Sequence, residues 1–256
     1  MDLRVLGCHG GETIKHRTSS FLINGRIAID AGAVTSMLTL EEQLAIDAVL
    51  VSHAHLDHVR DLATLADNRC QMGGRPLVIA STTETLAALK THFFNDVVWP
   101  DFSQIPNPRG EPTLVFQELV AEKTVEIAGA AVTPVMVHHT IDTCGFIVDA
   151  GSAALAYSGD TGPTDRLWEV LGTQKNLRAL LMEVSFPNAH HQLAKDSAHH
   201  TPETLDRELE KLKNDPNLPI MLYHIKPVFQ DEVERELAKI TKRNLHICQL
   251  GEQYVL

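Results

Sequence analysis

A series of short apolar runs, each rich in β-branched residues and bounded by glycine, aspartate or serine, extends over the first 160 residues of the chain. Runs of this kind are typical of β-strands. The predicted strands are residues 4–7, 19–23, 26–32, 48–53, 76–81, 113–119, 130–139, 144–151 and 154–160. Helical patterns lie between or after them, at about 39–46, 58–72, 82–95, 163–173, 201–213 and 230–242. Strands interleaved with helices predict stacked α and β layers.

The chain has 256 residues, which exceeds the usual size of one domain. Because α/β layer folds often reach this length, we expect a single domain over residues 1–256. Thr201 followed by Pro202 predicts a helix start, since threonine caps helices and proline fits their first turn. The proline-rich stretch at 99–112 is expected to form a long loop or lid, because structured patterns continue on both sides of it.

The net charge of −11 and the lack of a basic stripe argue against a large nucleic-acid partner and favour a small substrate. The widely spaced cysteines, Cys8, Cys70, Cys144 and Cys248, are expected to be free thiols. The sequence shows neither a secretory leader nor a long apolar run, so we expect a cytoplasmic protein without membrane contact. We also expect a homodimer.

The segment SHAHLDHV contains three histidines and an aspartate within six residues: His53, His55, Asp57 and His58. These residues directly follow an apolar strand and precede a helix. Neutral imidazoles and carboxylates are ligands that Zn²⁺ favours. Without a metal, packing these groups together would cost desolvation and, on protonation, mutual repulsion. A second buried strand, in AALAYSGDTG, ends in the same way at Asp160. We therefore expect both strand ends to face one metal-binding cleft.

HAHLDH resembles the HxHxDH signature of the metallo-β-lactamase superfamily. The other superfamily motifs have matches in chain order along the whole sequence: Asp30 in IAIDAG, His139 in VHHTIDTCGFIV, Asp160 in YSGDTG and His224 in LYHIKP. The resemblance implies an α/β fold, the four-layer αββα sandwich, with one or two metal ions bound at its edge.

Carried over by position, the resemblance implies two divalent metal ions, zinc or alternatively manganese or iron. One ion would be bound by His53, His55 and His139, the other by Asp57, His58 and His224, with Asp160 bridging the two.

Two further positions of these motifs admit more than one role. Asp30 would orient the HxHxDH turn as an outer carboxylate, although alone it could equally be a turn residue that ends a strand. His138 and His139 are adjacent, so in a strand they would point to opposite faces and only one could be a ligand. His139 directly precedes Thr140, as the family ligand does, and is the predicted one.

Within the superfamily, THFFNDVVWPDF, LMEVSFPN, HHTPETL and HIKP resemble stretches of the class II cyclic-nucleotide phosphodiesterases and their ribonuclease Z-like relatives. The Phe-Phe and Trp-Pro residues of the first stretch, Phe93, Phe94, Trp99 and Pro100, form either core beneath a loop or an apolar wall for a base. In the ribonuclease Z-like branch a glutamate at a strand end supports a histidine that protonates the leaving group.

Glu183 and His199 have that order and roughly that spacing. The predicted catalytic residues are therefore His199, Glu183 and the metal ligand Asp57, with His200 left open as an alternative proton donor. His190 and His191 are expected in a solvated loop.

The implied activity is hydrolysis of 3′,5′-cyclic nucleotides to 5′-monophosphates by a hydroxide held between two metal ions. A different hydrolase, such as an arylsulfatase, thioesterase or lactonase, is an alternative because fold and metal site do not fix the substrate. A ribonuclease Z-type tRNA 3′ endonuclease would need a basic arm, and no Lys/Arg cluster lies between His58 and His139. A redox or non-catalytic member is disfavoured, because His55 stands where flavodiiron-type relatives carry glutamate and no ligand is missing.

Overall fold

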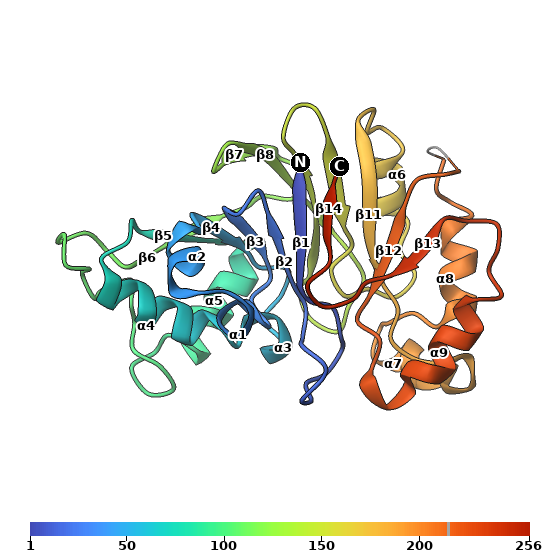
Figure 1. Ribbon diagram of the computed structural model, residues 1–256, viewed down its shortest axis with the longest axis horizontal. Helices are drawn as coiled ribbons and strands as arrows, with labels where there is room; N and C mark the ends of the chain where they lie inside the picture. The colour runs from blue at the N-terminus through green and yellow to red at the C-terminus, as the bar shows by residue number, and fades with distance from the viewer. Residues whose placement is uncertain (214–215) are drawn as a thin grey trace.

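The computed structural model describes residues 1–213 and 216–256 and consists of two mixed β-sheets that pack face to face, with helices on both outer faces (Figure 1). The first sheet has the strand order β14-β1-β2-β3-β4-β5-β6, and the second has the order β13-β12-β11-β10-β9-β8-β7. The fold is therefore a four-layer αββα sandwich, which confirms the predicted fold class.

The strands of the first sheet are β1 (Asp2–Gly7), β2 (Ser20–Ile23), β3 (Ile27–Ile29), β4 (Ala48–Leu50), β5 (Leu77–Ser81), β6 (Leu114–Glu118) and β14 (Gln253–Val255). Those of the second are β7 (Val125–Ile127), β8 (Ala130–Met136), β9 (Cys144–Asp149), β10 (Ala154–Tyr157), β11 (Leu177–Glu183), β12 (Ile220–Tyr223) and β13 (Leu245–Ile247). β3 to β6 run parallel to one another, as do β10 to β13.

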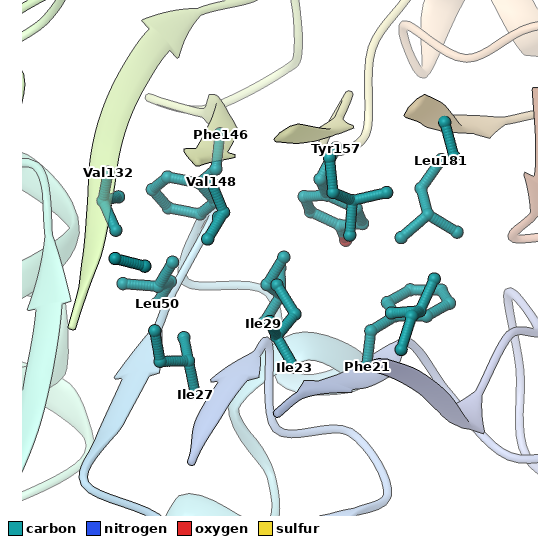
Figure 2. Close-up of a cluster of buried hydrophobic side chains, with 14 of the residues drawn as sticks. Phe21, Ile23, Ile27, Ile29, Leu50, Val132, Phe146, Val148, Tyr157 and Leu181 are labelled. Atoms are coloured by element: carbon teal, nitrogen blue, oxygen red, sulfur yellow. The ribbon is translucent and has the colours of Figure 1, made fainter. Parts of the chain in front are cut away.

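The core between the two sheets is formed by alternate strand residues from each inner face. Figure 2 shows Phe21, Ile23 and Ile29 of the first sheet facing Phe146, Val148, Tyr157 and Leu181 of the second. All of these side chains are buried. Burying an aliphatic or aromatic side chain of this size contributes about 1.5–3 kcal/mol, so this layer is a main source of stability.

The helices cover the outer faces and enclose two further apolar layers. On the first sheet lie α1 (Val34–Met37), α2 (Leu40–Ala45), α3 (Leu56–Val59), α4 (Leu62–Met72) and α5 (Thr83–His92). On the second lie α6 (Arg166–Leu171), α7 (His191–Asp196), α8 (Pro202–Leu209) and α9 (Gln230–Leu237), with 3₁₀ turns η1 (Asn188–His190) and η2 (Pro227–Phe229). Thr201 caps α8 and Pro202 is its first residue, as predicted.

All nine predicted strands and all six predicted helices are present with shifted ends, but the predicted helix at 58–72 is interrupted between α3 and α4. The sequence patterns missed α1, α7, β7 and the last four strands, β11, β12, β13 and β14. The predicted strand at 130–139 was too long, because β8 ends at Met136. His138 and His139 therefore lie in the loop that follows β8 rather than in a strand.

The aromatic residues of the Trp-Pro loop belong to the core. Phe94 and Phe102 are buried in the layer between the first sheet and its helices, and Phe93 and Trp99 pack against that layer. The Trp99 indole also donates a hydrogen bond to the Ala63 carbonyl, at 2.9 Å. Of the two readings of this cluster, the structure favours core beneath a loop.

Cys8, Cys144 and Cys248 are buried and Cys70 is half-buried; all four are free thiols, as expected. Among the described residues, no helix is both long enough and apolar enough to cross a membrane.

Candidate metal centre and active site

The candidate site lies where parallel strands of both sheets reach their carboxyl ends. β4 is followed by His53, β10 by Asp160 and β12 by His224, while β11 ends at Glu183. α/β folds place their chemistry at this edge because the loops that leave it converge. The helices that flank the edge, α3 and α7, lie at the same end of the sandwich (Figure 1). The structure thus brings together every residue that the sequence motifs singled out for the metal site.

One group of potential ligands contains His53, His55 and His139, whose ligand atoms all lie within 4.8 Å of one another. His55 Nδ1 lies 3.1 Å from His53 Nε2 and 3.2 Å from His139 Nε2. His53 is buried, whereas the other two are partly exposed. Three ring nitrogens that face one point in this way can hold one metal ion.

A second group contains Asp57, His58 and His224, again with ligand atoms within 4.8 Å of one another. His224 Nε2 lies 3.4 Å from Asp57 Oδ2, and His58 Nε2 lies 3.9 Å from the same oxygen. Asp57 retains 30% side-chain exposure, so the group is open to solvent on that side. Asp57 is therefore placed with one carboxylate oxygen facing two histidine nitrogens.

Asp160 lies between the two groups. Its Oδ2 is 3.9 Å from His53 Nε2, 3.2 Å from His58 Nε2 and 3.0 Å from His224 Nε2. A carboxylate in this position can bridge two ions. Burial acts to raise the pKa of Asp160, but His224 and His58 outweigh it and hold the pKa well below its ordinary value. The carboxylate is thus negatively charged in a fully buried position, where it favours nearby cations.

The donor set fits metal ions, because buried polar atoms within it have no hydrogen-bond partner. Among the described residues these include His58 Nε2, His224 Nε2 and Asp160 Oδ1. Buried polar groups left unpaired cost about 1–3 kcal/mol each. The short contacts to Asp160 Oδ2 lack hydrogen-bond geometry at His58 and His224, so cations bound between these atoms would satisfy all of them.

The outer nitrogen, Nδ1, of His58 and of His139 is held by an acceptor, which leaves Nε2 of each ring facing the site. His58 Nδ1 donates to Asp30 Oδ2 at 2.7 Å. His139 Nδ1 donates to the Ala198 carbonyl at 3.2 Å. A carbonyl and an ionised carboxylate can only accept, so Nδ1 carries a proton in both rings and Nε2 is the atom available to a metal ion. Outer partners of this kind orient metal ligands and fix their tautomer.

Two serines hold Nδ1 of His53 and of His224 in the same way. Ser52 Oγ donates to Asp30 Oδ2 at 2.8 Å and therefore accepts from His53 Nδ1 at 2.9 Å. Ser185 Oγ donates to Glu183 Oε2 at 3.1 Å and accepts from His224 Nδ1 at 2.9 Å. Each hydroxyl has only one proton, so these directions follow from the carboxylate partner. Ser52 and Ser185 were not singled out from the sequence, where serine carries no distinguishing pattern.

Several site histidines are kept neutral by their surroundings. Burial lowers the pKa of His53 well below its ordinary value, and burial likewise lowers the pKa of His139 to about 4. Burial also acts to lower the pKa of His58, but the Asp160 and Asp30 carboxylates outweigh it and raise this pKa well above its ordinary value. The same negative charge that attracts a proton to His58 would attract a metal ion.

Asp30 lies beneath the HxHxDH turn and is the common acceptor of several hydrogen bonds there. Besides His58 and the Ser52 hydroxyl, it accepts hydrogen bonds from the Ser52 backbone amide at 2.7 Å and the Tyr157 hydroxyl at 2.6 Å. It adopts a left-handed backbone conformation with φ of 55°, which is strained for a residue with a side chain. Asp30 therefore ties the turn to the second sheet and does more than end a strand.

Glu183 and His199 form a buried pair next to the metal groups. Glu183 Oε1 lies 3.0 Å from His199 Nδ1, and the carboxylate is completely buried. Burial acts to raise the pKa of Glu183, but the neighbouring His199 outweighs it and lowers the pKa. The His199 ring stacks on His224 with a centroid distance of 5.1 Å. An ionised glutamate thus holds Nδ1 of His199 and leaves Nε2 free for another contact.

His138 and His200 lie apart from these groups. His200 is buried, with its Nδ1 3.1 Å from the Thr204 hydroxyl, and among the described residues it is in none of the possible metal-holding groups. His138 is likewise absent from those groups in the described chain. His190 and His191 are exposed, as expected, but they lie in η1 and at the start of α7 rather than in a loop.

Comparisons with known proteins identify the family of the chain. Residues 26–224 match the β-lactamase superfamily domain, and the chain belongs to that superfamily. The family and the metallo-β-lactamase fold agree with the groups of metal-type ligands at the site.

Two relatives of the chain are named for the same activity. The chain is 28% identical to a probable 3′,5′-cyclic-nucleotide phosphodiesterase of Yersinia pestis, over 82% of this chain and 66% of that protein, so it spans just under two-thirds of that relative. It is 25% identical to a 3′,5′-cyclic-nucleotide phosphodiesterase of Aliivibrio fischeri, over 99% of this chain and 89% of that one.

Among solved structures, unliganded yeast PDE1 superimposes with a TM-score of 0.84 at 19% identity, covering 100% of this chain and 99% of that one. The short form of human tRNase Z gives a TM-score of 0.70 at 16% identity, covering 100% and 99% of the two chains. At these identities the structural likeness establishes the shared fold alone.

Proposed function

We propose that this protein hydrolyses 3′,5′-cyclic nucleotides to 5′-monophosphates with the help of two divalent metal ions. The observation that carries the proposal is the buried Glu183–His199 pair beside the metal groups, at 3.0 Å. A cyclic phosphodiester has a strongly basic alkoxide leaving group and needs a proton donor at such a position. The named relatives support the same substrate class. We also propose that residues 1–256 form a single domain and that the protein acts as a homodimer.

In this proposal one ion is held by His53, His55 and His139, the other by Asp57, His58 and His224, and Asp160 contacts both. Zinc suits this set of imidazoles and carboxylates, and manganese or iron are alternatives. When bound, such ions supply Lewis acidity and lower the pKa of water. The protein's contribution is to fix the ligand atoms through the hydrogen bonds to Asp30, Ser52, Ser185 and the Ala198 carbonyl.

His199 would protonate the 3′ oxygen as the bond from that oxygen to phosphorus breaks. Glu183 would hold the ring in one orientation and stabilise its protonated form. General-acid help of this kind is worth about 10² to 10⁴-fold in rate. His199, and not His200, is assigned this role because the His200 ring is turned toward Thr204. Asp57, half-open to the cleft, would contribute both as a ligand and by orienting the attacking water.

A panel assay of purified, metal-loaded protein tests the substrate class. We expect turnover of cyclic AMP and cyclic GMP, with the 5′-monophosphate as the only nucleotide product. Bis(p-nitrophenyl) phosphate should serve as an activated substitute. Faster turnover of an aryl sulfate, a thioester or a lactone than of either cyclic nucleotide would replace the proposal with a different hydrolase.

A tRNA 3′ endonuclease is the second candidate, because the chain is also 28% identical, over 61% of its length, to a Caenorhabditis elegans zinc phosphodiesterase, ELAC protein 2 homolog. Ionic strength separates the two candidates. An enzyme that neutralises several tRNA phosphates loses affinity steeply with salt, whereas one phosphate contact gives a shallow dependence. We expect KM for a cyclic nucleotide to change only a few-fold between low and moderate salt. A steep salt dependence together with cleavage of precursor tRNA would favour the endonuclease.

Ser185 provides a test of the support beneath the site. Ser185→Ala removes the hydroxyl that accepts from His224 and donates to Glu183. Loss of such outer partners typically costs about 10 to 100-fold in metal affinity or activity, and we expect metal affinity, measured by chelator competition, to fall in that range. Ser152→Ala, at an exposed position, is the matched control and should keep the wild-type affinity. Equal affinity in both variants would remove Ser185 from the metal support.

A further inference from the structure

A cavity of about 590 Å³ opens beside His199, between α7 and α8. This volume lies within the range of about 300–1,000 Å³ typical of small-molecule sites. His199, which is 7% exposed, forms part of its lining, as do Ala194 and Ala198. The cavity therefore reaches the residue proposed as the acid from the side of α7 and α8.

The position of the cavity determines what it can hold. His199 contacts the metal groups through its ring neighbours His139 and His224, with centroid distances of 5.0 and 5.1 Å, and it also borders the cavity. A proton donor must lie at the leaving oxygen, which in a cyclic nucleotide is part of the nucleoside. The nucleoside would then extend from His199 into the cavity.

Three charged side chains line the cavity beside its histidines and threonines: Lys195, Glu203 and Arg207. Lys195 on α7 is exposed and has no ion-pair partner among the residues that the structure describes. Glu203 on α8 is 59% exposed and pairs with Arg207 one turn further along the same helix. The cavity thus offers a hydrogen-bond donor from one helix and an acceptor from the other, both on flexible side chains.

Purines differ in how they match such a lining. Guanine presents two adjacent acceptors, O6 and N7, which lysine and arginine recognise, while adenine presents a donor beside N7. Guanine also carries adjacent N1–H and N2–H donors that suit a carboxylate. Lys195 and Glu203 together therefore match both polar edges of guanine, whereas adenine would leave one of the two side chains poorly paired.

We propose, building on the proposed function, that this cavity is the nucleobase pocket and that Lys195 and Glu203 make it selective for guanine over adenine. Discrimination by one well-paired contact of this kind corresponds to about 5- to 150-fold. Ala194 and Ala198 would leave room for the flat ring. The substrate preferred by the enzyme would then be cyclic GMP.

Binding of the products 5′-GMP and 5′-AMP, measured by calorimetry on metal-loaded protein, tests the pocket without requiring turnover. We expect 5′-GMP to bind about tenfold more tightly than 5′-AMP. Lys195→Met and Glu203→Gln should each bring the ratio of the two affinities close to one. Both positions are exposed, so neither change should affect folding.

Lys123→Met is the matched control, because Lys123 is exposed in the turn before β7 and that strand lies at the opposite end of the sandwich from α7 (Figure 1). It should keep the wild-type ratio. Equal affinity of the wild-type protein for the two nucleotides, or an unchanged ratio in both pocket variants, would overturn the guanine pocket. Failure to hydrolyse any cyclic nucleotide would instead overturn the proposed function. Calorimetry tests the pocket and the activity assay tests the function, so the two failures are distinguishable.

Discussion

Replacing Asp160 with asparagine should lower kcat/KM for a cyclic nucleotide by about 10³-fold, which corresponds to about 4 kcal/mol of transition-state stabilisation. This magnitude lies within the several kcal/mol that bound metal ions contribute. Asparagine has nearly the same volume, so packing is retained. It lacks the negative charge that faces His53, His58 and His224, and a neutral amide is a much poorer ligand between two cations.

Kinetics and metal content of the purified Asp160→Asn protein check this result, and the bound metal should fall together with the activity. Asp165→Asn serves as the control, since the Asp165 side chain is 84% exposed and lies in none of the possible metal-holding groups of the described chain. Wild-type turnover in Asp160→Asn would remove Asp160 from the site.

Replacing His199 with alanine should slow ring opening of a cyclic nucleotide by about 10² to 10³-fold, while activity on bis(p-nitrophenyl) phosphate is largely kept. The physical reason is that the need for a proton grows with the basicity of the leaving group. The ribose 3′-alkoxide is strongly basic, whereas p-nitrophenolate leaves readily without a proton. Comparing kcat for the two substrates in the variant and the wild-type enzyme gives the selectivity.

Glu183→Gln should show a weaker form of the same selectivity, because glutamine still accepts from His199 Nδ1 but does not stabilise its positive charge. His200→Ala, at the neighbouring position, should show no selectivity between the two substrates. If His199→Ala slows both substrates equally, His199 positions the substrate or supports the fold, and the proton must come from elsewhere.

The fold could be predicted largely because its N-terminal half has short, clear patterns. The pattern at 48–53 predicts an apolar strand that runs into the HxHxDH cluster, and the structure has β4 at Ala48–Leu50. The missed strands explain where patterns fail. β12 is a run of four buried apolar residues, and periodicity alone does not distinguish such a run from a buried helix segment. β11 carries Glu183 at its end but follows a stretch without a turn signal as clear as those in the first half.

The candidate ligands could be recognised because histidine and aspartate are rare in such density, whereas their support could not. Ser52 and Ser185 act through a single hydroxyl, and only the packed structure shows that each hydroxyl joins a histidine to a carboxylate. The position of His139 after β8 depends on where that strand ends, which a pattern fixes to within a few residues only. The cavity beside His199 arises from two helices, one of which, α7, has no clear sequence signature.

In the proposed mechanism, seven side chains hold two metal ions on which hydrolysis depends. Titrating metal-free protein with Zn²⁺, while recording bound metal by mass spectrometry and turnover of a cyclic nucleotide in the same samples, tests it most directly. We expect binding to saturate near two ions per chain and activity to rise with occupancy to a maximum at that ratio. Full activity in protein that retains close to no metal would contradict it.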